Sequence, residues 1–300
     1  MKLGMIIRPE VEEVKHAKEL GLDFVELDLN YPKWFGKPMS EITPLLPELK
    51  KAFEENDMEC GAVGRWASQI IGDDGEAVPE EMAEVKSVID FGAQLGATHY
   101  LVSVGYNKNL TYYGNITAAI KVLREIVAYA KDHGMTTSIV NCMMGNNYIR
   151  TPEQWKLVLD EVPGLTIKYD PSHSFVHGGE HGAYLSEAMH WGDRFGYVHI
   201  KGVIQLGDSC EPKHWKQYDI VRELPDYAKY SEEDMAEDGN LYDNPPAGID
   251  SINWRAFFGA LYQHHYDGYL SIEPHSRTWQ GELGEKGVKY TIKYIRDLML

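Results

Sequence analysis

Three residues with metal-binding side chains lie at the ends of predicted strands. Asp170, His199 and Glu273 each end, or nearly end, a run of β-branched and aromatic residues of the kind found in buried strands. Pro171 and Pro274 follow two of these residues, and proline cannot donate a hydrogen bond to a continuing sheet. Carboxylate and imidazole groups together bind divalent ions of hard to borderline character. If the three strand ends meet, the chain can hold one divalent metal ion.

Two further polar side chains accompany the candidate ligands. Lys201 lies two positions after His199, and therefore on the same face of its strand. A lysine that faces a closed interior is costly unless it is paired, so we expect Lys201 either to be functional or to form a salt bridge. His275 lies two positions after Glu273 and is as consistent with substrate contact as with support of a metal ligand.

The elements that would position these residues alternate between strand and helix along the whole chain. Apolar runs predict strands at Lys2–Arg8, Asp23–Asp28, Glu59–Val63, Tyr100–Val104, Thr136–Val140, from Thr166 to a stop at Pro171, Tyr197–Lys201 and Tyr269–Ile272. Amphipathic or capped segments predict helices at about Glu10–Leu20, Pro44–Asn56, Pro79–Leu95, Ile116–His133, Thr151–Glu161, Ala183–Trp191, Asn253–His264 and Gly287–Leu298. This alternation predicts an α/β fold, a single (β/α)8 TIM barrel that spans residues 1–300. All C-terminal strand ends then lie on one face, where the three candidate ligands converge.

Residues 202–248 do not fit the alternating pattern. The segment is rich in Asp, Glu, Tyr and Pro, and it is too long for an ordinary barrel loop. It follows the seventh predicted strand, so it begins on the catalytic face. We expect it to be a lid over the barrel or an interface with a partner chain, packed through aromatic residues such as Trp215 and Tyr230.

The composition restricts the possible partners. A formal charge of −17 repels phosphate backbones and argues against nucleic acid as a partner. No apolar run is long enough to span a membrane, and the N-terminus has no signal-peptide layout. The 3 cysteines are far apart and odd in number, which argues against a disulfide framework and favours a cytoplasmic location.

Four motifs resemble those of the xylose-isomerase-like TIM barrels, the sugar phosphate isomerase/epimerase superfamily. They are Tyr169–His173, Val198–Lys201, Pro246–Asp250 with Trp254 before a helix, and Ser271–His275. The resemblance covers most of the chain. It implies that Asp170, His199 and Glu273 bind one divalent ion, Mn²⁺ or Mg²⁺, and that His173 contacts the bound sugar or the metal. It also implies a small carbohydrate substrate.

The chain departs from this family at the end of the fifth predicted strand. The family pattern ends in Glu-Asn, and the chain has Val140-Asn141. The resemblance implies that the missing Glu is both a metal ligand and one of the two acid/base groups of the epimerases. Asn141 could supply an oxygen ligand, or contact substrate, if the strand end shifts by one residue. A mechanism with one base, such as enolisation, elimination or hydration, fits Val140 better than two-base epimerisation.

These observations lead to one main functional hypothesis and several alternatives. The main hypothesis is a metal-dependent isomerase or epimerase that acts on a sugar or keto-sugar, with Glu273 or His275 removing the proton alpha to a carbonyl and Lys201 orienting hydroxyl groups. Glu26 and Trp66 are candidate substrate contacts, although Glu26 could instead pair with a neighbouring strand and Trp66 could pack at the barrel rim.

The alternative functions are a lyase or hydratase, the catalytic subunit of a C-glycoside (3-oxo-sugar) deglycosylase with a smaller subunit, or a binding barrel without catalysis. A DNA-repair endonuclease shares the barrel, but the acidic charge opposes it. We expect a homo-oligomer or a complex with a smaller subunit.

Overall fold

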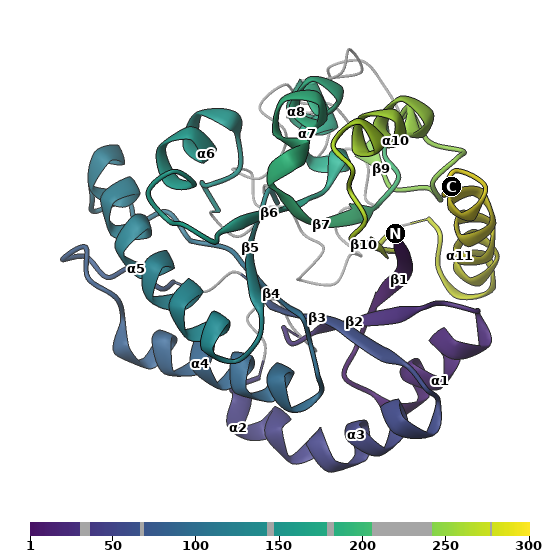
Figure 1. Ribbon diagram of the computed structural model, residues 1–300, viewed down its shortest axis with the longest axis horizontal. Coiled ribbons are helices and arrows are strands. Elements are labelled where there is room, and N and C mark those ends of the chain that lie inside the picture. Colours follow the sequence, from purple (N-terminus) through teal and green to yellow (C-terminus); the bar gives the residue numbers. More distant parts are fainter. Residues whose placement is uncertain (31–36, 67–68, 143–146, 179–182, 206–241, 277) are drawn as a thin grey trace, which may run out of the picture.

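The computed structural model describes residues 1–30, 37–66, 69–142, 147–178, 183–205, 242–276 and 278–300. Its centre is a closed barrel of parallel strands surrounded by helices, which confirms the predicted (β/α)8 fold (Figure 1). The barrel strands are β1 (Lys2–Ile7), β2 (Phe24–Asp28), β3 (Glu59–Arg65), β4 (His99–Val102), β5 (Thr136–Val140), β6 (Thr166–Tyr169), β7 (Phe195–Ile200) and β10 (Tyr269–Ile272). Each strand pairs with its neighbour in the chain, and β10 closes the ring against β1.

The helices of the described residues form the outer layer. They are α1 (Val11–Glu19), α2 (Met39–Ile42), α3 (Leu46–Glu55), α4 (Pro79–Gln94), α5 (Tyr112–Asp132), α6 (Pro152–Val158), α7 (Pro171–Gly178), α8 (Ala183–Trp191), α10 (Trp254–Gln263) and α11 (Gly281–Arg296). Short 3₁₀ turns at Thr43–Leu45 and Gly192–Arg194 complete this layer. None of the helices in the described part of the chain is long and apolar enough to cross a membrane.

Helix starts follow from local capping. The predicted start of α6 is confirmed, because Thr151 and Gln154 form a reciprocal capping box with Pro152 in the first turn. Helix α5 begins at Tyr112, earlier than predicted, because Oγ1 of Thr111 accepts a hydrogen bond from the backbone N–H of Gly114 at 3.0 Å.

Helix α7 was not predicted. Pro171 ends the strand, as expected, but it is also the first residue of this helix. Proline suits that position, because the first helical N–H has no partner within a helix. Oδ1 of Asp170 accepts a hydrogen bond from the backbone N–H of Ser172 at 2.8 Å, which stabilises the start of α7.

Strand alternation divides the barrel residues into an outer and an inner set. Outward-facing Ile, Leu and Val side chains pack against the helices in the main core. The inner set includes a smaller apolar cluster of Phe24, Ala62, Leu101, Val140 and Tyr197. Polar inner residues lie on the side of this cluster toward the C-terminal ends of the strands. We call this end of the barrel the mouth.

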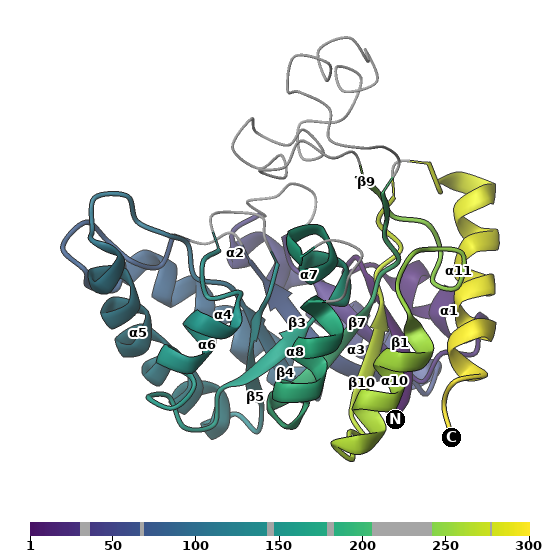
Figure 2. The ribbon, with the colours of Figure 1, turned by 90° about the horizontal axis from the view of Figure 1, so that it is seen from above.

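The predicted insertion lies mainly outside the described residues, which end at Gln205 and resume at Tyr242. The predicted lid or interface role of residues 206–241 therefore remains a prediction. The flanking residues form a two-stranded antiparallel sheet of β8 (Ile204–Gln205) and β9 (Tyr242–Asp243). In Figure 2, β9 lies beyond the barrel on the side away from both chain termini.

Candidate functional site

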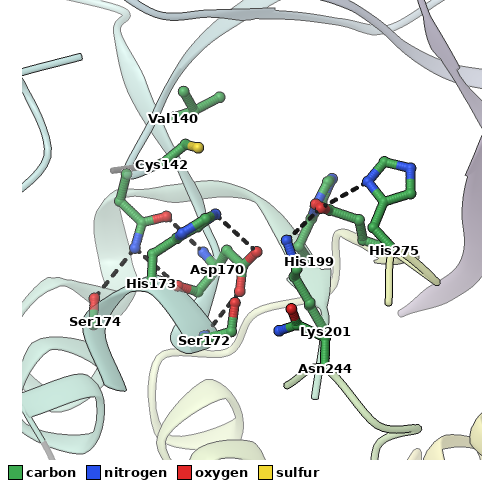
Figure 3. Close-up of polar contacts among 12 residues, drawn as sticks. Val140, Cys142, Asp170, Ser172, His173, Ser174, His199, Lys201, Asn244 and His275 are labelled. Atoms are coloured by element: carbon green, nitrogen blue, oxygen red, sulfur yellow. Dashed lines mark hydrogen bonds and ion pairs between the residues drawn. The ribbon is translucent and has the colours of Figure 1, made fainter. Parts of the chain in front are cut away.

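The three predicted metal ligands meet at the mouth. Asp170 follows β6, His199 lies on β7, and Glu273 follows β10. Their candidate ligand atoms all lie within 4.8 Å of one another. Figure 3 shows Asp170 and His199 side by side, with Lys201 and His275 next to them. The closed barrel thus brings together residues that are far apart in the chain.

Asp170 is fully buried and held by its backbone. The side chain of Asn141 accepts a hydrogen bond from the Asp170 N–H at 2.8 Å and donates one to the Asp170 carbonyl at 2.9 Å. Both polar atoms of Asn141 are therefore engaged in positioning Asp170. Oδ1 of Asp170 accepts from Ser172, whereas Oδ2 is buried without a hydrogen-bond partner among the described residues. An unsatisfied buried carboxylate oxygen requires an explanation, and a bound cation provides one.

His199 lies between two carboxylates. Its Nδ1 atom is 2.7 Å from Oε2 of Glu273, and its Nε2 atom is 2.8 Å from Oε2 of Glu26. Burial lowers the pKa of His199, but the two carboxylates outweigh burial and raise it. For Glu26, burial acts in the opposite direction and raises the pKa. The positive charges of His199 and, to a smaller extent, Lys168 outweigh burial, so the pKa of Glu26 is lowered. Glu26 contacts the imidazole across the barrel rather than a neighbouring strand.

Glu273 is the centre of a second set of charges. Lys201 donates from Nζ to its Oε1 atom at 2.6 Å, and Nδ1 of His275 lies 3.1 Å from the same atom. Burial raises the pKa of Glu273, but Lys201 and the two histidine contacts lower it well below its usual range. The expected salt bridge of Lys201 is therefore present. His275 is 60% exposed and touches Glu273, so it supports this carboxylate from the solvent side.

His173 lies on α7 beside Asp170. Its Nε2 atom is 3.4 Å from Oδ2 of Asp170, close to the unsatisfied oxygen. Burial lowers the pKa of His173 to about 3, with a further contribution from Lys201. His173 is thus a neutral imidazole next to the candidate metal position, able to donate or accept one hydrogen bond.

Strand β5 contributes no carboxylate to the mouth. Val140 is 1% exposed and lies in the inner apolar cluster, and Cys142, two positions later, packs against the same cluster. Trp66 also packs there. Asn30 holds the backbone of Trp66, accepting from its N–H at 2.7 Å and donating to its carbonyl at 2.6 Å.

Two inner residues near the site were absent from the predicted set. Lys168 lies two positions before Asp170, is 3% exposed, and stands in register with Val140. Asp28 lies at the end of β2. Burial raises the pKa of Asp28 to about 6, with the nearby Glu26 and Glu273 carboxylates adding to the effect. Side chains two positions apart share a strand face, so Asp170 could have identified Lys168, and Glu26 could have identified Asp28.

The Pro246–Asp250 motif has a structural position next to the site. Asp250 accepts hydrogen bonds from the backbone N–H of Gly248 at 2.9 Å and of Val203 at 3.3 Å, and from Nε1 of Trp254 at 3.0 Å. A side chain at Gly202 would collide with the carbonyl of Pro245, so glycine permits the close approach of these segments. The motif therefore ties the segment after β7 to the start of α10.

The residues present fit a divalent metal ion. Two carboxylates and one imidazole converge, and one carboxylate oxygen is buried without a hydrogen bond from the described residues. This donor set suits Mn²⁺, Mg²⁺ or Zn²⁺, and it does not select strongly among them.

The fold and the mouth define a (β/α)8 barrel with a mixed carboxylate and imidazole site. The chain belongs to the xylose isomerase-like TIM barrel family, whose model matches residues 14–298. A sequence comparison with curated proteins finds no match.

Several solved structures share the fold. D-allulose 3-epimerase from Methylomonas sp., in complex with D-allulose, is 16% identical with a TM-score of 0.64, covering 99% of this chain and 98% of that one. The 3-keto-D-glucoside 4-epimerase from E. coli is 15% identical with a TM-score of 0.63, covering 99% of each chain. The IolI protein with a bound zinc atom is 15% identical with a TM-score of 0.70, covering 99% of this chain and 98% of that one. At these identities the likeness concerns the fold.

Proposed function

We propose that the protein is a metal-dependent enzyme that enolises a sugar or keto-sugar, as an isomerase or a related lyase. The observation that carries this proposal is the convergence of Asp170, His199 and Glu273 around the Oδ2 atom of Asp170, which is buried and accepts no hydrogen bond from the described residues. The similar structures of sugar epimerases support a carbohydrate substrate. The zinc-bound IolI structure supports a divalent ion in a barrel of this kind.

The metal, when bound, would act as a Lewis acid that polarises a substrate carbonyl and its neighbouring hydroxyl. The residues of the chain orient the sugar and move the proton. Glu273 is the leading candidate for the base, because its carboxylate lies at the mouth beside the other candidate metal ligands. His173 is neutral and can hydrogen-bond a hydroxyl group, and Lys201 holds the Glu273 carboxylate in place.

Val140 favours a mechanism with one base. A valine cannot transfer a proton, and its neighbour Asn141 is engaged with the Asp170 backbone. We expect stereospecific removal of one proton, followed by isomerisation, elimination or hydration. Inversion of a carbinol centre requires an acid/base group on each face, so we do not expect it. Cleavage of a 3-oxo-sugar glycoside by the same enolisation is the second candidate.

The test follows proton exchange with solvent. The protein is stripped with chelator, reloaded with Mn²⁺, Mg²⁺ or Zn²⁺, and incubated in D₂O with D-fructose, D-allulose or a 3-keto-D-glucoside. NMR should show metal-dependent exchange of one carbon-bound proton in at least one substrate, and Asp170→Asn should abolish it. Rapid interconversion of two C3 epimers would contradict the one-base mechanism. A protein that binds none of the three ions would contradict the proposed function itself.

The place of action and the assembly remain proposals too. We infer that the protein is a cytoplasmic enzyme of carbohydrate metabolism. We also infer that it forms a homo-oligomer or a complex with a smaller subunit. Light scattering of the purified protein tests the assembly.

A further inference from the structure

Lys168 carries an ammonium group that makes no direct contact with a carboxylate in the described part of the chain, although its charge acts on Glu26 from a distance. Its residue is 3% exposed. Among the residues that the structure describes, no hydrogen bond or ion pair reaches its Nζ atom. The contact shown is with an aromatic ring: Nζ lies 6.0 Å from the ring centroid of Trp66. Lys201, in contrast, donates to Glu273 at 2.6 Å.

A largely enclosed charge without a direct partner is costly to the folded state. Nζ is not among the fully buried polar atoms that lack a hydrogen bond, so it keeps some access to solvent. Its enclosure still costs part of the hydration of the charge, which a cation–π contact of about 1–2 kcal/mol offsets only in part. A methionine or leucine would fill the same place in an apolar cluster at no such cost. The barrel therefore keeps at Lys168 a group that packing alone does not require.

The position of Lys168 relates it to the site. It lies on the same strand face as Asp170 and in register with Val140, the place where the missing carboxylate would stand. Its charge contributes to the lowered pKa of Glu26 and of His173, so it lies close to the groups that surround His199.

Trp66 is held so that it covers this part of the interior. A Cβ atom at Gly64 would lie 1.9 Å from Cζ3 of Trp66, so only glycine lets the ring fold back over β3. Asn30 fixes the Trp66 backbone from the other side. The ring and the ammonium group together form an apolar face with one cation beside it.

We propose that Lys168 donates a hydrogen bond to the substrate oxygen that becomes negatively charged when the neighbouring carbon is deprotonated. This inference rests on the proposed function. In that reaction the base takes the proton of the alpha carbon, and the bonding pair moves into the new C=C bond. The carbonyl π pair then moves to oxygen, which becomes the enolate oxygen. A cation beside that oxygen stabilises the charge as it develops, and Trp66 covers the C–H face of the sugar.

The test compares a planar anionic analogue of an enediolate with its neutral counterpart. Binding of D-threonohydroxamate and of D-threonamide is measured by calorimetry on Mn²⁺-loaded protein. The variants are Lys168→Met and Lys168→Gln, which remove the charge at similar length. Lys286→Met, on exposed α11, is the matched control. Metal content and near-ultraviolet circular dichroism are recorded for each protein.

We expect the wild-type protein and Lys286→Met to prefer the hydroxamate strongly. Lys168→Met should reduce this preference about 10- to 100-fold, the range for a hydrogen bond to a charged group, with unchanged metal content and little change for the amide. An unchanged preference in folded Lys168→Met overturns the inference and leaves the proposed function standing. Loss of folding in both Lys168 variants assigns the residue to the fold and also overturns it. A wild-type protein with no preference for the hydroxamate contradicts the proposed function, and the inference with it.

Discussion

Oε2 of Glu26 lies 2.8 Å from Nε2 of His199, and neither side chain is exposed. The two residues come from β2 and β7, which are not neighbours in the barrel. The contact fixes the imidazole plane and leaves Nδ1 directed toward Glu273. A carboxylate behind a ligating imidazole typically sets its orientation and raises its basicity.

The first prediction concerns Glu26. Glu26→Gln keeps the size of the side chain but removes its charge, so the imidazole of His199 loses a carboxylate partner. We expect Mn²⁺ affinity to fall about 10- to 100-fold while the three ligands remain in place. Titration calorimetry of the stripped protein measures this change. Unchanged affinity would show that Glu26 does not act through His199.

The second prediction separates the two roles of Asp170. Asp170→Asn retains an oxygen that can accept from Ser172 at the start of α7, so the melting temperature should change by only a few degrees. The variant lacks the anionic oxygen for a metal, and metal content measured by mass spectrometry should fall to a small fraction of one ion per chain. Asp160 is exposed and forms an ion pair with Arg194 on the surface, so the control variant Asp160→Asn should bind metal normally. Equal metal content in the two variants would place the ion elsewhere.

The third prediction concerns Val140. Val140→Glu introduces a carboxylate in register with Lys168, whose ammonium group offsets part of the burial cost. We expect Mn²⁺ to bind about tenfold more tightly, because one more anionic group faces the mouth. Val140→Gln has the same size without the charge and should not tighten binding. A Val140→Glu protein that binds metal no better than Val140→Gln would argue against this position as the lost ligand site.

Part of the fold and site follows from sequence because it depends on local pattern. Strand β5 and helix α8 have the predicted bounds, and Asp170, His199 and Glu273 converge because parallel strands in a barrel share one mouth. Lys168 was missed because an isolated lysine in a strand is usually solvent-exposed. Only the closed barrel shows that its face is the interior.

Other differences have equally physical causes. Helix α7 was missed because Pro171 was interpreted only as the end of a strand, although proline after an aspartate also begins helices. Asn141 was considered as a ligand, but its amide is bound to the backbone of the next strand's Asp170, a pairing that depends on register. The side-chain partners of Glu26 likewise depend on which strands face each other across the barrel.

The fourth prediction concerns His99 and pH. His99 lies on β4 at the opposite end of the barrel interior, next to Tyr197 and Tyr269. Burial lowers its pKa from 6.5 to about 4, so the unfolded chain takes up a proton first as the pH falls. The contribution of His99 to stability is complete above pH 6.5 and is lost between pH 6.5 and about 4.

Chemical denaturation tests this dependence. Between pH 7 and pH 5, the wild-type protein should lose about 2 kcal/mol more unfolding free energy than His99→Gln. His190→Gln, on the exposed side of α8, should follow the wild type. If the wild type and His99→Gln lose the same amount, His99 is not buried in its neutral form.

The short sheet of β8 and β9 allows residues 206–241 to vary in sequence and length independently of the barrel. Because Gln205 pairs with Tyr242, the two residues that flank this segment lie side by side. A change in the length or sequence of this segment need not alter the spacing between β7 and α10. Asp250 fixes that spacing separately, because it accepts hydrogen bonds from Val203 after β7 and from Trp254 at the start of α10. A two-residue Asn-Gly turn could join Gln205 to Tyr242 in an antiparallel hairpin. Gln205 and Tyr242 thus mark a site at which a segment can be exchanged without altering the strands of the barrel.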